Sequence, residues 1–234
     1  MIMRQESAIN PKTAFTKHVP CSATGKTVFG IKNIVCFGDS ITAGKSVPEN
    51  RRWTSLLQTG LDAKGADRWS VFGRGVAGET IVDGLDRFDK DVAGLLPAIV
   101  LIEFGLNDGS HHANRRVPRT GLNEFVSVLR ELIRLVRDGG GHPILLTNHL
   151  IDPARIEETS GARCAENLAP YQSAIRQTAS LEHAALIDVE AGFALLADLG
   201  PVLSADGVHL TSEGHVHYAA IVAGNLHPLL PTLS

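Results

Sequence analysis

Residues 98–105 read AIVLIEFG, a fully apolar run of five residues followed by Glu103, Phe104 and Gly105. A continuous apolar run, rather than an alternation of apolar and polar residues, is typical of a strand buried on both faces of a sheet. Four other short, largely apolar segments resemble it, at residues 34–37, 69–72, 143–147 and 185–189. The sequence therefore predicts a central parallel sheet of about five strands.

Segments with apolar residues at helical spacing separate these strands. They are 53–61, 81–96 (stopped near Pro97), 125–136 (ending at the glycines 139–141), 171–181, and a last helix from Ser212 toward Asn225. His215 and His217 are expected on the polar face of that last helix, and the polar residues 148–167 are expected to form a loop near the site. The alternation of strands and helices predicts an α/β fold, a three-layer α/β/α sandwich.

The length of 234 residues and the hydrophobic content of 44% suffice for one sizeable domain, which we expect at residues 31–234. Residues 1–30 show no periodicity and carry Ser, Thr, Lys, Pro and Gly. We expect them to form a flexible arm.

The net charge of -3 argues against nucleic acid as the main partner, because phosphate binding needs a basic surface. No basic amphipathic stretch and no long apolar run indicates a membrane partner. The first thirty residues lack the apolar core of a secretory signal, which predicts a cytoplasmic protein and leaves a secreted mature form open. Cys21, Cys36 and Cys164 are too few and too far apart to indicate a disulfide framework or a zinc site. Oligomeric state is not indicated by any of these patterns.

Ligands of parallel sheets bind beyond the carboxyl ends of the strands, and four polar groups of residues follow strands or precede the last helix. Ser40 lies in Phe37-Gly38-Asp39-Ser40, directly after the first strand, where a hydroxyl can face a substrate. An ordinary turn or a helix N-cap is the alternative interpretation. Gly78 lies in the glycine-rich segment 73–80, whose backbone N–H groups can face an oxyanion. A phosphate or dinucleotide loop is its alternative, although the spacing of neither motif is present.

The other two groups contain Asn107 and the pair Asp206 and His209. Asn107 can direct its amide at developing negative charge, or it can simply favour a turn. Asp206 stands three residues before His209, close enough for its carboxylate to hold the imidazole at Nδ1 and leave Nε2 free to accept a proton. The alternative for His209 is a polar surface or capping residue.

In this order, the four groups resemble the SGNH hydrolase superfamily, also called GDSL esterases and lipases. The four name-giving residues of that family match Ser40, Gly78, Asn107 and His209, and its acid matches Asp206. The resemblance spans residues 34 to about 220 and implies a flavodoxin-like fold. Many members have an asparagine where this chain has Gly73, a departure that could loosen the loop without removing the donor at Gly78.

The resemblance implies a serine hydrolase that cleaves carboxylic esters without a metal or an organic cofactor. Ser40, Asp206 and His209 are expected to form its catalytic triad, and Ser40, Gly78 and Asn107 its oxyanion hole. A small soluble short-chain acyl or acetyl ester is the expected substrate. Carbohydrate O-acetyl esters, thioesters and lysophospholipids are alternatives, and a non-catalytic binding module is the alternative outside hydrolases.

Asp39 and His149 are candidate substrate-binding residues. A structural role is the alternative for Asp39, because a carboxylate next to a serine in sequence need not face its hydroxyl. His149 follows the fourth strand, where a surface turn is equally plausible. His111 and His112 could line the pocket, and adjacent histidines without carboxylate support favour an exposed loop over a metal site.

Overall fold

The computed structural model describes residues 32–64, 69–111 and 117–230. The expected arm at residues 1–30 and the side chain of His112 lie outside these ranges. The sheet has five parallel strands in the order β2-β1-β3-β4-β5, as in flavodoxin-like folds. They are β1 (Asn33–Gly38), β2 (Ser70–Gly75), β3 (Ala98–Glu103), β4 (His142–Leu146) and β5 (Ala185–Ile187). The predicted sheet and α/β class are confirmed.

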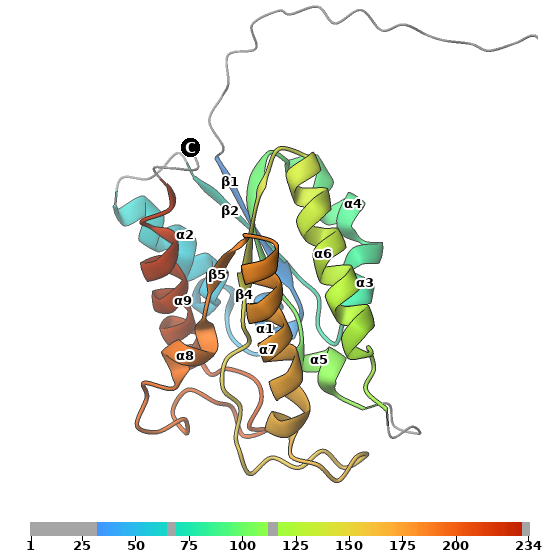
Figure 1. Cartoon of the computed structure of the whole chain (residues 1–234). Helices are drawn as coiled ribbons and strands as arrows, with labels where there is room; N and C mark the ends of the chain where they lie inside the picture. Colours follow the sequence, from blue (N-terminus) through green and yellow to red (C-terminus); the bar gives the residue numbers. More distant parts are fainter. Residues whose placement is uncertain (1–31, 65–68, 112–116, 231–234) are drawn as a thin grey trace, which may run out of the picture.

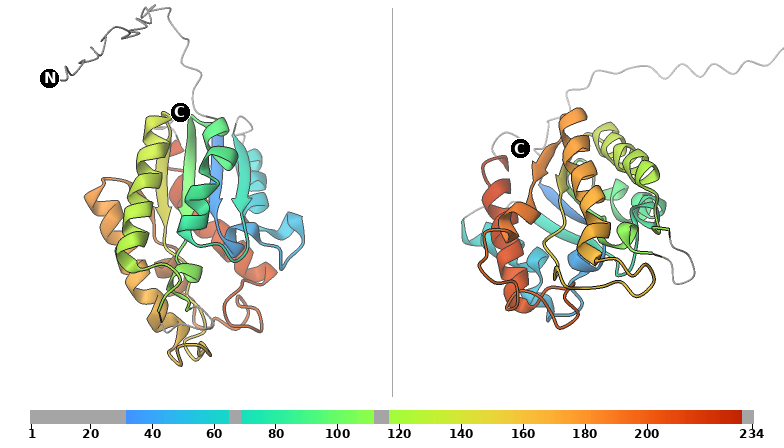
Figure 2. Two further views of the ribbon diagram at one scale, coloured as in Figure 1. Left: turned by 90° about the vertical axis from the view of Figure 1, so that its right-hand side faces the viewer. Right: turned by 60° about the horizontal axis from the view of Figure 1, so that its bottom comes forward.

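Helices cover both faces of this sheet, which gives the three layers seen in Figures 1 and 2. One face packs against α2 (Trp53–Ala63), α8 (Val189–Phe193) and α9 (Ser212–Leu226). The other face packs against α3 (Ile81–Asp86), α4 (Phe88–Asp91), α6 (Leu122–Asp138) and α7 (Cys164–Leu181). Alternate strand residues enter the two cores: Ile99 and Leu101 belong to the first, and Val100 and Ile102 to the second. This double burial explains why β3 is apolar at every position from 98 to 102.

The segment 81–96 is not one helix, contrary to the prediction. A capping box between Thr80 and Asp83 starts α3, but the chain leaves helical geometry at Arg87 and continues as α4 and a short 3₁₀ turn, η2 (Ala93–Leu95). The Arg87 guanidinium bonds the carboxylates of Glu79 and Asp91 and the carbonyls of Gly38 and Arg74. These contacts link distant parts of the chain, so apolar periodicity does not reveal them.

Two further helices differ from the prediction in their details. Helix α7 begins at Cys164, seven residues earlier than expected, and it accommodates Pro170 within its length. His215 is not on a polar face, since its side chain is 1% exposed and Nδ1 accepts a 3.3 Å hydrogen bond from the Trp53 N–H. His215 therefore joins the start of α2 to α9. No helix in the described part of the chain combines the length and apolar composition that a bilayer crossing requires.

His215 should make the fold sensitive to mild acid. Burial, assisted by the positive charge of Arg52, lowers its pKa from 6.5 to about 4. As the pH falls from 6.5 toward 4, the unfolded chain therefore binds a proton that the folded chain refuses, and the free energy of unfolding decreases. His215→Gln should reduce this decrease by on the order of 1 kcal/mol per pH unit. Urea unfolding at a series of pH values measures it, and identical pH slopes for the two proteins would contradict the expectation.

Candidate active site

The predicted site residues meet at the carboxyl ends of the strands, at the lower edge of the sheet in Figure 1. Ser40 is the first residue of α1 (Ser40–Ala43), directly after β1. Asn107 lies in α5 (Leu106–Gly109), directly after β3. Gly78 follows β2, and His209 precedes α9. Segments from four parts of the chain therefore converge on one edge of the sheet.

Close packing of backbone segments holds the turn that carries Ser40. Asp39 is the N-cap of α1, and its carboxylate accepts a 2.9 Å hydrogen bond from the Ile41 N–H. A Cβ on Gly38 would lie 2.5 Å from Thr42 Oγ1 of α1 and 2.5 Å from the Glu103 carbonyl oxygen of β3, and a Cβ on Gly75 would lie 2.1 Å from the Ala43 nitrogen. Glycine at 38 and 75 thus lets α1 lie directly against the strands.

A line of two hydrogen bonds joins Ser40, His209 and Asp206. The distance from Ser40 Oγ to His209 Nε2 is 3.0 Å, and His209 Nδ1 lies 2.7 Å from Asp206 Oδ2. Asp206 Oδ1 also accepts hydrogen bonds from the Ser204 hydroxyl and from the Val208 and His209 N–H groups. Partial burial acts to raise the pKa of Asp206, but these hydrogen bonds outweigh it and hold the pKa well below its usual range. The carboxylate is therefore ionised where it meets the imidazole.

Three potential oxyanion donors lie beside this line. Within the described residues, neither the Ser40 N–H nor the Gly78 N–H donates a hydrogen bond, and Gly78 has the left-handed φ of +81°. Asn107 Nδ2 instead donates to Asp39 Oδ2 at 3.1 Å and to the Glu79 carbonyl at 3.0 Å. An oxyanion near Ser40 would share one of these two amide hydrogens with an acceptor that already uses it.

The model of the GDSL-like lipase/acylhydrolase family matches residues 36–216. The chain belongs to this family. All five residues predicted for the triad and the oxyanion hole lie within the matched range. The resemblance inferred from the four motifs is thereby confirmed.

Individual GDSL-like relatives show how far this likeness extends. The chain is 30% identical to the arylesterase of Vibrio mimicus over 115 residues, which cover 49% of this chain and 54% of that protein, so the match spans about half of the relative. It is 26% identical to the acetylxylan esterase of Geobacillus stearothermophilus over 200 residues, 79% of this chain and 89% of that protein. The structure of the lipase/acylhydrolase from Enterococcus faecalis superposes with a TM-score of 0.72 over 87% of this chain and 98% of that chain, at 24% identity, which shows the shared fold.

His149 supports the loop that carries His209 and does not line the cavity beside Ser40, contrary to the prediction. Its side chain is fully buried, and Nε2 lies 2.7 Å from the carbonyl oxygen of Val208, the neighbour of His209. Burial lowers its pKa to about 4, so the ring is neutral at pH 7 and donates Nε2–H to that carbonyl. The Asp152 N–H donates to the adjacent Gly207 carbonyl at 2.8 Å. The residues after β4 therefore hold the backbone that positions His209.

Asp39 is also fully buried, so it does not contact a substrate in this conformation, and the structural role given as its alternative applies. Burial raises its pKa to about 7. Glu103 lies nearby at the end of β3, where Oε2 accepts a 2.8 Å hydrogen bond from Thr42 and Oε1 a 2.7 Å bond from Asn148. Burial and the neighbouring Asp39 hold the pKa of Glu103 well above its usual range. Glu103 thus connects α1 to the chain after β4, and Asp39 connects α1 to Asn107 of α5.

Glu103 was not predicted as a site residue, although one feature of the sequence distinguishes it. Glu103 ends an otherwise apolar strand, and a charged residue in such a place needs partners. Its partners Thr42 and Asn148 are 61 and 45 residues away, Thr42 two residues after Ser40 and Asn148 in the segment after β4. A charged residue at the end of an apolar strand marks Glu103 as unusual. The sequence does not show which residues Glu103 binds.

A cavity of about 150 Å³ opens beside Ser40 and His209. Its other lining residues come from α5, α7, the loops around them and the loop before α9: Leu106, Asn107, Gly109, Ser110, Glu157, Cys164, Asn167, Leu168 and Val208. Sequence reasoning did not single out Glu157, Asn167 or Leu168, because they lie in the segment expected to be irregular or at the start of α7.

His111, a possible pocket-lining residue, instead forms a pair with Glu157 at the edge of this cavity. Its Nδ1 lies 2.7 Å from Glu157 Oε2, and its N–H donates to Glu157 Oε1. Ser160 and Asn167 also donate to Glu157 Oε2. These bonds tie the loop before α7 to α5. No group of three or more His, Cys, Asp or Glu side chains in the described ranges is arranged to hold a metal ion.

Proposed function

We propose that this chain is a serine esterase that hydrolyses carboxylic esters through an acyl-enzyme intermediate. The observation that carries the proposal is the hydrogen-bonded line from Ser40 Oγ through His209 to Asp206, with distances of 3.0 and 2.7 Å. A serine hydroxyl is a weak nucleophile until a base accepts its proton, and the His209 Nε2 is within reach to do so. Membership of the GDSL-like lipase/acylhydrolase family supports the same chemistry.

In the proposed reaction, His209 takes the Ser40 proton as Oγ attacks the ester carbonyl carbon. Asp206 keeps the imidazole in the tautomer whose Nε2 accepts and stabilises the imidazolium that forms. The resulting oxyanion is received by the Ser40 and Gly78 N–H groups and the Asn107 amide. Imidazolium then protonates the leaving alcohol. Water, deprotonated by His209, attacks the acyl-enzyme and releases the carboxylic acid together with free Ser40.

Asn107→Ala tests the oxyanion role that we propose for the amide. Removing one such donor is expected to lower kcat by roughly 10²–10³ and to leave KM little changed, because the developing charge exists only in the transition state. Asn107 also bonds Asp39, so the variant needs a thermal unfolding measurement beside its steady-state kinetics. An effect confined to KM would contradict the assignment.

We propose small, short-chain acyl or acetyl esters as substrates. The cavity beside Ser40 has about 150 Å³, less than the roughly 300–1,000 Å³ of pockets that take drug-sized ligands, and this size favours a short acyl group. Leu106, Leu168 and Val208 give it apolar walls suited to a short acyl group. Acetyl removal from a carbohydrate is the second candidate, supported by the likeness to a protein named acetylxylan esterase.

A series of p-nitrophenyl esters tests this size limit. We expect kcat/KM to be greatest for acetate or butyrate and to be at least about tenfold lower for octanoate, because the longer chain cannot be buried in the cavity. Leu168→Ala, which enlarges the cavity, should raise the octanoate-to-acetate ratio. A preference for octanoate or palmitate in the unaltered protein would refute the proposed substrate class and leave the nucleophile unaffected.

A further inference from the structure

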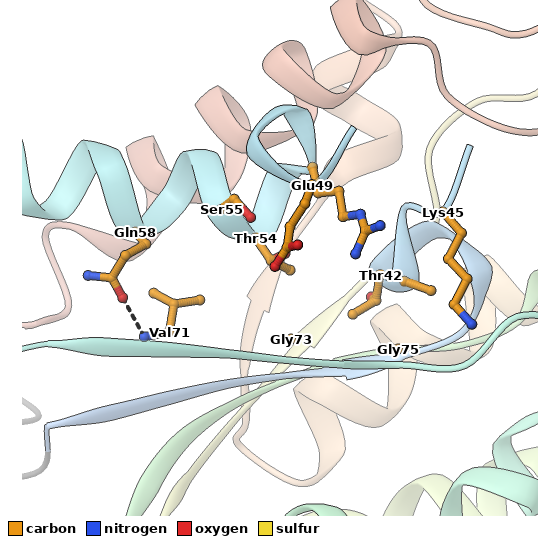
Figure 3. Close-up of a pocket in the computed structure, with 11 residues that line it drawn as sticks. Thr42, Lys45, Glu49, Thr54, Ser55, Gln58, Val71, Gly73 and Gly75 are labelled. Atoms are coloured by element: carbon orange, nitrogen blue, oxygen red, sulfur yellow. Dashed lines mark hydrogen bonds between the residues drawn. The ribbon is translucent and has the colours of Figure 1, made fainter. Parts of the chain in front are cut away.

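A second cavity, of about 380 Å³, lies between α2 and the edge strand β2. In Figure 3, Gly73 and Gly75 form its floor on β2, while Thr54, Ser55 and Gln58 face them from α2. Neither Ser40 nor His209 lines it. It is therefore a compartment apart from the proposed ester site, although Thr42 and Ala43 of α1 reach its wall.

Arg52 lines this cavity, and its guanidinium has no carboxylate partner in the part of the chain that the structure describes. A Cβ on Gly44 would lie 2.8 Å from Arg52 Cγ, so the stem of the side chain is packed against that glycine. Nε is buried and has no hydrogen-bond partner within the described residues. Among the ion pairs of the described residues, none involves Arg52. Because a buried charged donor without a partner is costly, this guanidinium is poised to bind an acceptor.

The floor of the cavity adds a backbone donor. The Ser70 and Val76 N–H groups donate toward β1, to the carbonyls of Lys32 and Gly38. Residues of a parallel strand alternate in direction, so the N–H groups of Val71 and Gly73 face away from β1. The Val71 N–H donates to Gln58 Oε1 at 2.7 Å, which confirms the direction, and Gly73 presents its N–H on the same side. A Cβ at residue 73 would lie 3.5 Å from Thr54 Oγ1, so glycine leaves the space between β2 and Thr54 open.

Charges and hydroxyl groups complete the lining. The ammonium of Lys45 and the carboxylate of Glu49 are on exposed residues, and neither forms an ion pair within the described residues. The hydroxyls of Thr54 and Ser55, in the first turn of α2, make no hydrogen bond within those residues either. Arg52, Lys45 and Glu49 together give this cavity one excess positive charge, and the positive end of the α2 dipole adds to it.

We propose that this cavity is a second binding site, which takes a small oxyanion, a carboxylate or a phosphate, on the Arg52 guanidinium. The planar fork of arginine donates two parallel hydrogen bonds to such a group. The Gly73 N–H and the Thr54 and Ser55 hydroxyls supply further donors around it. Lys45 attracts the anion, whereas Glu49 repels it and limits its affinity.

The test is titration of the full chain with sodium acetate and, separately, with inorganic phosphate at constant ionic strength, followed by amide chemical shifts. We expect saturable shifts at Gly73 and at the start of α2 with one or both anions, and the anion that binds more tightly identifies the class. Arg52→Met keeps the packed stem, removes the guanidinium and should weaken binding at least about tenfold. Arg51→Met is the matched control, because Arg51 is exposed and does not line the cavity.

Two more variants make the result decisive. Glu49→Gln removes the repelling charge and should tighten binding about two- to fivefold, whereas a site for a cation or a neutral sugar would bind its ligand less well or equally. Ser40→Ala should bind the anion as the unaltered chain does, which separates this site from the ester site. The proposal is overturned if neither anion produces saturable chemical-shift changes. It is also overturned if Arg52→Met and Arg51→Met weaken anion binding equally. If Arg52→Met does not fold, the Glu49→Gln result decides.

Discussion

Ser40→Ala is expected to lower kcat/KM for p-nitrophenyl acetate by roughly 10³–10⁶ while leaving the chain folded. The hydroxyl is the group that forms the bond to the acyl carbon in the proposed reaction, and no other side chain in the described part of the cavity stands at hydrogen-bond distance from His209 Nε2. Alanine removes one oxygen atom from the first residue of α1 and leaves its N-cap, Asp39, in place. The loss should therefore appear in kcat rather than in stability.

The control for Ser40→Ala is thermal unfolding together with Ser46→Ala. Ser46 lies six residues further along, and its hydroxyl makes only a 3.4 Å hydrogen bond to the Leu210 carbonyl. We expect Ser46→Ala to retain nearly all esterase activity. Hydrolysis by Ser40→Ala at the rate of the unaltered chain would show that another group is the nucleophile.

Asp206→Asn is expected to have the next largest effect, a decrease in kcat of roughly 10³–10⁴. Asp206 Oδ2 accepts a hydrogen bond from the Nδ1–H of His209, and Oδ1 accepts hydrogen bonds from three other donors. An asparagine oxygen can keep the three donors at Oδ1, so its NH₂ group would face the imidazole. His209 would then turn its proton to Nε2, and it could no longer accept the proton of Ser40.

Steady-state kinetics of Asp206→Asn should be compared with Asp198→Asn. Asp198 is an exposed aspartate whose carboxylate accepts the Gly200 N–H and touches no residue of the triad. We expect Asp198→Asn to retain full activity. If Asp206→Asn kept more than about a tenth of kcat, the carboxylate would not be holding the histidine tautomer.

The sequence predicted the sheet well because its central strands β1, β3 and β4 are buried on both faces. Residues 98–102 have to be apolar in that position, so their pattern identifies β3 without any knowledge of tertiary contacts. The triad was recognisable for a related reason. Its members lie in short motifs whose local spacing, such as three residues between Asp206 and His209, already brings the reacting atoms together.

The parts that were not predicted depend on contacts between distant segments. The expected helix at 81–96 is interrupted at Arg87, whose guanidinium bonds the Gly38 carbonyl, 49 residues away. His149 and His215 were expected to be accessible, but both are buried, because each bonds a distant segment, at Val208 and at Trp53. Asp39, for which a structural role was the alternative, is buried as well and bonds Asn107, 68 residues away. A polar residue in a motif does not reveal whether it faces the substrate or supports the residues that do. The cytoplasmic location stays a prediction.

Covalent labelling tests directly whether Ser40 is the nucleophile. The intact mass of the chain is measured after treatment with a fluorophosphonate, and the modified peptide is then identified. We expect one phosphonyl group per chain, attached to Ser40. The Ser40→Ala variant should form no adduct, and Asp206→Asn should be labelled much more slowly. An adduct on another residue, or equal labelling of Ser40→Ala and the unaltered chain, would contradict it.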